Sequence, residues 1–336
     1  MSDFQNRLES FLLNRNQPLD IEQLTPDAST REYFRVSWNG DTAIACVYPE
    51  PFVAADQSYL DVTNVFLAAG LPVAAIYDFD ENSGVIVQED LGDTILREVL
   101  ENSDDARRNE LIDEAICLIV RIQAATPIAF MADSIASKLK FDTEKLLWEL
   151  DFFKTHYFET FRKEKLSELD DRALEAEFTE LASELETHAT VLCHRDFHAA
   201  NLMIDKAGAL RIIDHQDARI GSATYDLVSL LLDRIIELPT HEWLAEKRAF
   251  FLNERTKLGL NALNEEAFTY EFRLQTIQRC LKATGTFSYQ SVNRGKTYFI
   301  PFIKPMLEIV LRASENIDRF PNLQRILKGE IGNRVA

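Results

Sequence analysis

An aspartate and an asparagine lie five positions apart in the stretch CHRDFHAANLMI, residues 193–204. Asp196 and Asn201 stand between two short apolar runs and follow a histidine and an arginine. In phosphoryl transfer the protein does little covalent chemistry. It needs an aspartate that orients the attacking hydroxyl and accepts its proton, and it needs oxygen ligands for magnesium. The residue types and spacing therefore predict a phosphoryl-transfer loop, with Asp196 as the catalytic base and Asn201 as a metal ligand.

A second metal ligand is expected at the end of a nearby strand. Asp214 ends the apolar run ALRIID and follows Asp196 by 18 residues. That separation is enough for a loop and a hairpin to return the chain to the same cleft. We therefore predict that Asn201 and Asp214 hold Mg²⁺ beside the base.

Each of these residues also has a structural interpretation. A single aspartate or asparagine in a turn is most often a turn-forming or capping residue. His194 and His198 have the i, i+4 spacing of a zinc pair, but such a pair needs a helix and a third ligand, and the flanking runs resemble strands. The conjunction of base, asparagine and following acid favours kinase chemistry.

The elements that position this loop fall into two groups. In the first ninety residues, the runs REYFRVSW and TAIACVY flank Asn39-Gly40, which is a strong hairpin signal. A helical pattern then stops at Gly70, and two more strand-like runs, VAAIYDF and GVIVQED, follow it. These patterns predict a small β-rich N-lobe over residues 1–90.

Helical periodicity dominates the rest of the chain. Amphipathic helices are predicted over 109–125 and 142–161, three short strands surround the motif, and the chain after Asp214 is helical almost to its end. The sequence therefore predicts an α+β fold. It has a hinge near residues 88–93 and a large helical C-lobe over 91–336, which carries the catalytic loop, the metal site and the substrate site.

The amino-acid composition limits which classes of partner the protein can bind. The 336 residues include 36 basic and 55 acidic side chains, and the net charge of −19 repels nucleic acid and anionic membrane surfaces. No run approaches 18 uninterrupted apolar residues, and the first residues lack a basic, then apolar, targeting pattern. Four scattered cysteines fit reduced thiols. We expect a cytoplasmic protein that binds neither nucleic acid nor membrane.

The central block resembles a known family. HRDFHAAN with IIDHQDARIGSATYDLVSLL, within residues 194–232, is similar to the aminoglycoside phosphotransferase and choline kinase group, which has a two-lobed, protein-kinase-like fold. DASTREYFRV, QEDLGD and QRCLKATGTF look closer to bacterial N-acetylmuramate/N-acetylglucosamine anomeric kinases, which phosphorylate C1 of amino sugars in cell-wall recycling. The resemblance implies an ATP- and Mg²⁺-dependent phosphotransferase whose small-molecule substrate is an amino sugar.

The resemblance also implies roles for single residues. The backbone of residues 88–91, with Glu89 and Leu91 as nucleotide contacts, would meet the adenine. Asp226 would brace the catalytic loop. Asp217 is left open between a contact to substrate or metal and a capping role in its own loop.

The lysine that usually holds the ATP phosphates is missing. Kinases of this fold carry it on the third strand, paired with a helix glutamate. The chain has no lysine before Lys138, and the following helical pattern DQSYLDVTNVFLAAG has no glutamate. Arg31 is the predicted substitute because a guanidinium binds phosphate bidentately, and Ser29 and Thr30 would add donors. Alternatively, Arg31 pairs with acids on a strand surface; Arg35 is left open between the two roles.

Two other functions stay open at this stage. One is a kinase for a different small hydroxyl compound, of the aminoglycoside or choline type. The other is a nucleotide-binding pseudokinase, favoured by the missing lysine and opposed by the intact set of Asp196, Asn201 and Asp214. A protein kinase is disfavoured, because DHQ replaces Asp-Phe-Gly and no Ala-Pro-Glu segment follows.

Substrate contacts would come from the helical lobe. One helix face carries Gln278, Lys282 and Gly285, with Arg279 beside it. These residues either contact the substrate or form a solvated helix face. An aromatic group could form a sugar platform, although packing in a helix core is favoured; its members are Trp148, Phe152 and Tyr157.

Overall fold

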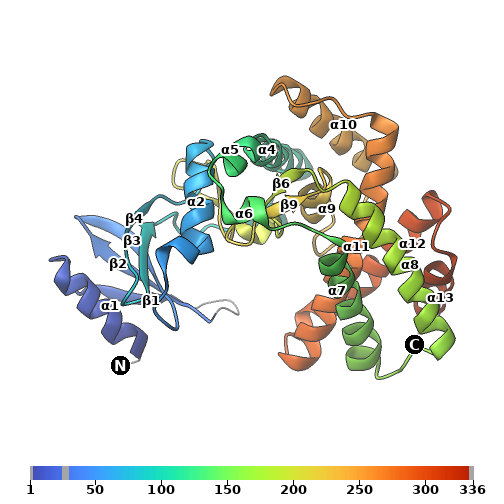
Figure 1. Cartoon of the computed structure of the whole chain (residues 1–336), viewed down its shortest axis with the longest axis horizontal. Coiled ribbons are helices and arrows are strands. Elements are labelled where there is room, and N and C mark those ends of the chain that lie inside the picture. The colour runs from blue at the N-terminus through green and yellow to red at the C-terminus, as the bar shows by residue number, and fades with distance from the viewer. Residues whose placement is uncertain (1–2, 25–29, 333–336) are drawn as a thin grey trace.

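The computed structural model describes residues 3–24 and 30–332. A small antiparallel sheet lies at one end of the molecule and a large helical part at the other, so the predicted α+β fold is confirmed (Figure 1). The sheet order is β1-β2-β3-β5-β4. The five strands are β1 (Ile21–Leu24), β2 (Glu32–Trp38), β3 (Asp41–Val47), β4 (Ile76–Asp80) and β5 (Val85–Glu89). The N-lobe boundary at residue 90 stays a prediction.

Two helices cover opposite faces of the sheet. Helix α1 (Asp3–Asn14) packs Leu8, Phe11 and Leu12 against one face. The other face meets α2 (Ser58–Ala68), with the short 3₁₀ helix η1 (Ala54–Asp56) before it. Burial alternates along β2, where Phe34, Val36 and Trp38 belong to the cluster under α1, because successive strand side chains point to opposite faces. The last three residues of β3 are all buried.

The hairpin and the helix end predicted in the first ninety residues are both present in the structure. Asn39 and Gly40 both have positive φ, 52° and 89°, and join β2 to β3 with Trp38 opposite Asp41. Two positive φ values suit the twist of a two-residue hairpin. Gly70, with φ of 67°, follows the end of α2.

The helical part begins after β5 and contains two small two-stranded sheets. Its strands are β6 (Val191–Cys193) paired with β9 (Arg219–Gly221), and β7 (Leu202–Ile204) paired with β8 (Leu210–Ile212). Its helices are α3 (Leu96–Glu101), α4 (Asp105–Ala124), α5 (Thr126–Met131), α6 (Ile135–Lys138), α7 (Thr143–Phe153), η2 (Lys154–Arg162), α8 (Glu168–Thr187), η3 (Ala199–Asn201), α9 (Tyr225–Leu231), α10 (His241–Lys257), α11 (Glu265–Asn293), η4 (Thr297–Phe299), α12 (Ile300–Asn316) and α13 (Pro321–Gly332).

The predicted helix over 142–161 is two elements. Helix α7 ends at Phe153, and the chain continues as the π-helix η2. Helix α11 crosses both, and its Gly285 makes the close approach possible: a Cβ there would lie 2.8 Å from the Cα of Phe153. Only a residue without a side chain fits between the two backbones.

One large hydrophobic core joins α2 to the helical part. Val62, Val65 and Phe66 of α2 belong to the same buried cluster as the apolar faces of α4, α7 and α11. The sheet is therefore attached to the C-lobe through its covering helix.

One helical stretch, Asp105–Met131, is long and apolar enough to cross a membrane, although charged residues interrupt it. Half of the stretch is buried inside the protein. Leu111, Ala115 and Ile119 of α4 lie in the central core. A core helix of this kind satisfies the same length and composition criteria, so the stretch is weak evidence for a membrane span.

Candidate active site

The loop after β6 is fixed by a buried carboxylate. Asp226, in the first turn of α9, is fully buried and accepts the backbone N–H groups of His194 at 2.7 Å and Arg195 at 3.0 Å. Burial raises the pKa of Asp226 to about 6, while these two donors oppose the rise. Arg195 takes a positive φ of 87°, a conformation that needs such external support. These contacts match the bracing role expected for Asp226.

The three residues predicted to carry the chemistry come together. Asn201 ends η3 before β7, and Asp214 follows β8 with φ of 61°. The Asn201 amide donates to the Asp196 backbone carbonyl at 2.9 Å and to the Asp214 carboxylate at 3.3 Å. The hairpin of β7 and β8 thus returns Asp214 to the base, as the separation along the chain predicted.

Asn201 and Asp214 suit magnesium. Mg²⁺ prefers oxygen ligands and is usually bound by one or two carboxylates together with waters and substrate phosphates. The Asn201 amide oxygen and the Asp214 carboxylate supply such a partial set. Among residues 3–24 and 30–332, no group of three or more His, Cys, Asp or Glu side chains could hold a metal. His194 Nε2 lies 2.9 Å from the Ile213 carbonyl, which accepts its hydrogen and leaves this nitrogen unsuited to zinc.

Three cations surround Asp196. Its Oδ1 is 3.0 Å from Lys282 Nζ and 3.3 Å from Arg279 Nη2, and its Oδ2 is 3.7 Å from Arg195 Nε. Burial alone would raise the pKa of Asp196, but these charges outweigh it and hold that pKa well below its ordinary value. The carboxylate is therefore ionised at neutral pH.

Two of these cations come from α11, whose face is not solvated. Gln278 and Arg279 are buried, and the side chain of Lys282 is 16% exposed. Sequence reasoning placed them on one helix face without assigning a contact. Asp217 pairs with Arg195 of the catalytic loop at 2.6 Å.

Arg31 reaches the metal-binding side of this cluster. Its guanidinium lies over the rings of Tyr33 and Tyr48, at 5.7 and 5.6 Å from their centroids, and its Nη2 is 4.0 Å from Asp214 Oδ1. Burial raises the pKa of the Cys46 thiol on β3 to about 11, against the nearby charge of Arg31. The guanidinium thus sits beside the strand from which other kinases extend their lysine.

The other residues predicted near the nucleotide differ in placement. Thr30 is exposed beside Arg31, and Ser29 lies outside the described residues. Arg35 pairs with Asp90 at 2.8 Å and Asp93 at 2.7 Å, so it ties β2 to the hinge segment.

Glu89 and Leu91 lie at the end of the sheet. The carboxylate of Glu89 binds Arg211 bidentately at 2.6 and 2.9 Å, and its backbone N–H donates to Ala75 at 2.8 Å. Leu91 is buried. This bidentate pair connects β5 to β8, the strand that leads to Asp214.

The aromatic residues considered as a sugar platform differ in burial. Tyr157 is 2% exposed and lies in the core, as favoured. Trp148 is 55% exposed, so the expectation of core packing is wrong for it. Trp148 and Phe152 lie one α-helical turn apart with ring centroids 5.7 Å apart. Tyr157 falls in η2, where the helix has a wider period than the pattern assumed.

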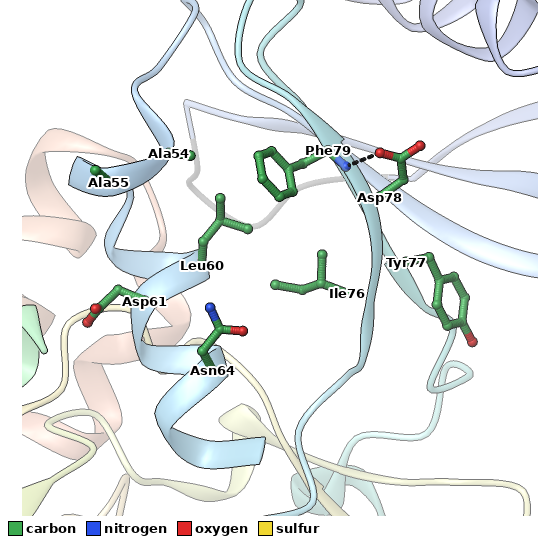
Figure 2. Close-up of a pocket in the computed structure, with 9 residues that line it drawn as sticks. All are labelled: Ala54, Ala55, Leu60, Asp61, Asn64, Ile76, Tyr77, Asp78 and Phe79. Atoms are coloured by element: carbon green, nitrogen blue, oxygen red, sulfur yellow. Dashed lines mark hydrogen bonds between the residues drawn. The ribbon is translucent and has the colours of Figure 1, made fainter. Parts of the chain in front are cut away.

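A hollow of about 530 Å³ lies away from these residues, between α2 and β4 (Figure 2). Leu60, Ile76 and Phe79 point into it. It contains no residue of the cluster around Asp196.

Comparison with known proteins decides the family. The model of the phosphotransferase enzyme family, which includes the aminoglycoside phosphotransferases, matches residues 20–260. The chain belongs to this family. It is therefore an enzyme that transfers a phosphoryl group to a hydroxyl acceptor. The match includes Arg31, Asp196, Asn201 and Asp214, and it stops before α11.

Relatives extend the likeness over nearly the whole phosphotransferase. An N-acetylmuramate/N-acetylglucosamine kinase from Neisseria meningitidis is 27% identical, covering 94% of this chain and 91% of that protein. A kinase of the same name from Pseudomonas aeruginosa is 27% identical, over 84% of this chain and 80% of its own.

Solved structures confirm the kinase-like fold. A putative aminoglycoside phosphotransferase from Ralstonia eutropha superimposes with a TM-score of 0.62 at 14% identity, covering 93% of this chain and 98% of that one. The choline kinase LicA from Streptococcus pneumoniae superimposes with a TM-score of 0.59 at 14% identity, covering 92% of this chain and 99% of that one.

Proposed function

We propose that this phosphotransferase is an ATP- and Mg²⁺-dependent kinase of N-acetylmuramate and N-acetylglucosamine. It phosphorylates the anomeric hydroxyl and acts in the cytoplasm during cell-wall recycling. The observation that carries the proposal is the cluster of Asp196, Asn201 and Asp214, facing Arg31, in a chain similar to kinases of that name over most of its length.

In this proposal, Asp196 receives the proton of the anomeric hydroxyl. Its depressed pKa keeps it ionised and able to orient the hydroxyl, and a positioned base of this kind contributes roughly 10²–10⁴-fold to rate. Asn201 and Asp214 would hold Mg²⁺, which neutralises charge on the phosphates when bound.

The N-lobe would hold the nucleotide. Arg31 would bind the phosphates in place of the missing lysine, with Ser29 and Thr30 as further donors. The backbone near Glu89 and Leu91 would meet the adenine. The half-buried position of Arg31 next to Asp214 supports catalysis over a pseudokinase, because Arg31 would supply the charge that the lysine otherwise provides.

The test is magnesium-dependent ATP consumption with N-acetylmuramate, N-acetylglucosamine, kanamycin, choline or no acceptor. We expect turnover confined to the two amino sugars. Asp196→Asn should lower kcat by about a thousandfold while ATP still binds, because the general base is removed and the phosphate contacts remain.

Asp105→Asn is the matched control, since this carboxylate is 94% exposed on α4. It should leave turnover unchanged. Turnover of kanamycin or choline in place of the sugars would overturn the acceptor assignment, and normal turnover by Asp196→Asn would overturn the assigned base.

A further inference from the structure

Two more cations extend the charge around Asp196 toward α7. The Arg219 guanidinium lies 5.3 Å from the centroid of the Phe141 ring. Four residues after Phe141, in the first turn of α7, Lys145 Nζ lies 3.9 Å from the centroid of the Trp148 ring. Burial lowers the pKa of Lys145, the charge of Glu149 opposes this shift, and the charges of Arg195, Arg219 and Lys282 lower the pKa further. Lys145 therefore shares one electrostatic region with the catalytic loop.

The local charge is opposite to that of the whole chain. Five cationic side chains share this region with four carboxylates, although the chain carries a net charge of −19. The cations are Lys145, Arg195, Arg219, Arg279 and Lys282, and the carboxylates are Asp196, Asp217, Glu149 and Asp233. Gathering like charges in a partly buried place is costly. An anionic group bound among them would remove much of this cost.

Buried polar atoms without partners lie in the same region. Glu149 is fully buried, and its Oε2 accepts from Gln278 at 2.8 Å. Within the described ranges, Glu149 Oε1, Arg195 Nε and Tyr225 Oη are buried and have no hydrogen-bond partner. Glu149 and Tyr225 are both electrostatic neighbours of Arg195, so the three groups lie near one another. Because buried polar atoms are normally hydrogen-bonded, these atoms indicate a polar ligand.

An exposed aromatic face borders the cations. Trp148 is 55% exposed, with Phe152 beside it on α7. An aromatic face offers an apolar surface to the C–H groups of a sugar ring, and the neighbouring Lys145 ammonium offers a charged donor. Helix α7 thus presents an apolar ring face and a positively charged donor side by side.

We propose that the acceptor binds beside Asp196 between α7 and α11, and that Lys145 selects an amino sugar that carries a carboxylate over a neutral one. This inference rests on the proposed function. Of the two sugars, N-acetylmuramate has the carboxylate, on its lactyl group, and N-acetylglucosamine lacks it. Cationic acceptors, such as aminoglycosides and choline, are disfavoured by the same charges.

Lys145→Met tests the selection, because methionine keeps an unbranched side chain against Trp148 and removes the charge. We expect kcat/KM for N-acetylmuramate to fall about tenfold, as for loss of one hydrogen bond to a charged group. For N-acetylglucosamine it should change less than about twofold. Lys145→Arg should retain the preference of the wild type.

Lys304→Met on α12 is the control, because this lysine is 53% exposed and pairs only with Glu308 among the described residues. It should alter neither sugar. An equal loss with both sugars, or no loss with either, in Lys145→Met would overturn the role of Lys145 while leaving the proposed function intact. If wild type phosphorylates neither sugar, the proposed function fails.

Binding provides a readout that does not depend on turnover. In calorimetry without nucleotide, N-acetylmuramate should bind wild type about tenfold more tightly than Lys145→Met, and the difference should shrink as salt is added. Equal binding to both proteins would overturn the inference.

Discussion

A single guanidinium, that of Arg31, is proposed to bind the ATP phosphates. Arg31 begins next to β2, and its side chain passes between Tyr33 and Tyr48 to within 4.0 Å of Asp214. A lysine would reach the same place from β3, where Cys46 is buried instead. The charge is thus delivered from a neighbouring strand. A guanidinium also differs from an ammonium in presenting two parallel donors to a phosphate.

Arg31→Ala should raise KM for ATP by about tenfold or more, because a charge-assisted contact to phosphate is lost. Arg31→Lys should recover only part of that loss, since lysine cannot bind bidentately. Steady-state kinetics with ATP varied provides the measurement. Arg172→Ala, at a side chain that is 78% exposed, is the control. An unchanged KM for ATP in Arg31→Ala would place the clamp elsewhere.

Residue-scale prediction from sequence succeeds where partners are close along the chain. Asp196, Asn201 and Asp214 lie within one loop and hairpin, so their spacing was enough to predict that they meet. Arg279 and Lys282 contact Asp196 from 83 and 86 residues away. Their contact depends on how α11 packs across the molecule, which periodicity along a helix does not specify.

At the scale of elements, α11 and the joint between α7 and η2 set the geometry of the proposed acceptor site. Because Gly285 has no side chain, α11 and α7 approach so closely that the Phe153 backbone occupies the space a Cβ at residue 285 would need. The sequence predicted a single helix over 142–161, because α- and π-helices share the same amphipathic composition. It also missed β9, which lies in the stretch after Asp214 that was predicted to be helical. The hairpin at Asn39-Gly40 was predictable because its backbone conformation is specific to those residue types.

Gly285→Ala should lower the free energy of unfolding by about 1–3 kcal/mol, because the new Cβ meets backbone rather than a movable side chain. Denaturant unfolding measures it. Gly329→Ala is the matched control, since that helical glycine has nothing within 4 Å of an added Cβ. The control should be neutral or stabilising by up to about 1 kcal/mol. Equal effects of the two substitutions would refute the close approach.

At the scale of the whole molecule, His215 joins α2, the helix that covers the sheet, to the loop that carries Asp214. Its Nε2 lies 2.7 Å from the Thr63 hydroxyl of α2, and its ring packs between Tyr59 and Phe66 with centroids 5.0 and 5.2 Å away. Burial lowers the pKa of His215 to about 3, and His194 adds to the shift. The protein therefore keeps this imidazole neutral where the unfolded chain would protonate it.

Acid should weaken the fold through His215. Below its unfolded pKa of 6.5, the unfolded state binds a proton that the folded state excludes, so stability falls with pH down to about 3. From pH 7 to pH 5, this amounts to roughly 2 kcal/mol. His215→Phe keeps an aromatic ring without a titrating group.

Denaturant unfolding of wild type and His215→Phe at pH 7 and pH 5 measures the difference. The variant should lose less stability over this interval, whatever its stability at pH 7. Thr63→Val is the control, because it removes the hydrogen bond and leaves the imidazole in place, so the acid-dependent loss should persist. An identical loss in wild type and His215→Phe would contradict the assignment.

The pair between Glu89 and Arg211 attaches the β4–β5 side of the sheet to the C-lobe, in addition to the attachment through α2. The backbone bond from Ile212 to Pro72, at 2.9 Å, lies near the same β4–β5 edge. A rocking of the sheet about this connection would move points further with distance from it. Arg31 precedes β2, on the side of the sheet away from β4. In such a motion the segment proposed to meet the adenine would move least, and Arg31 would move further.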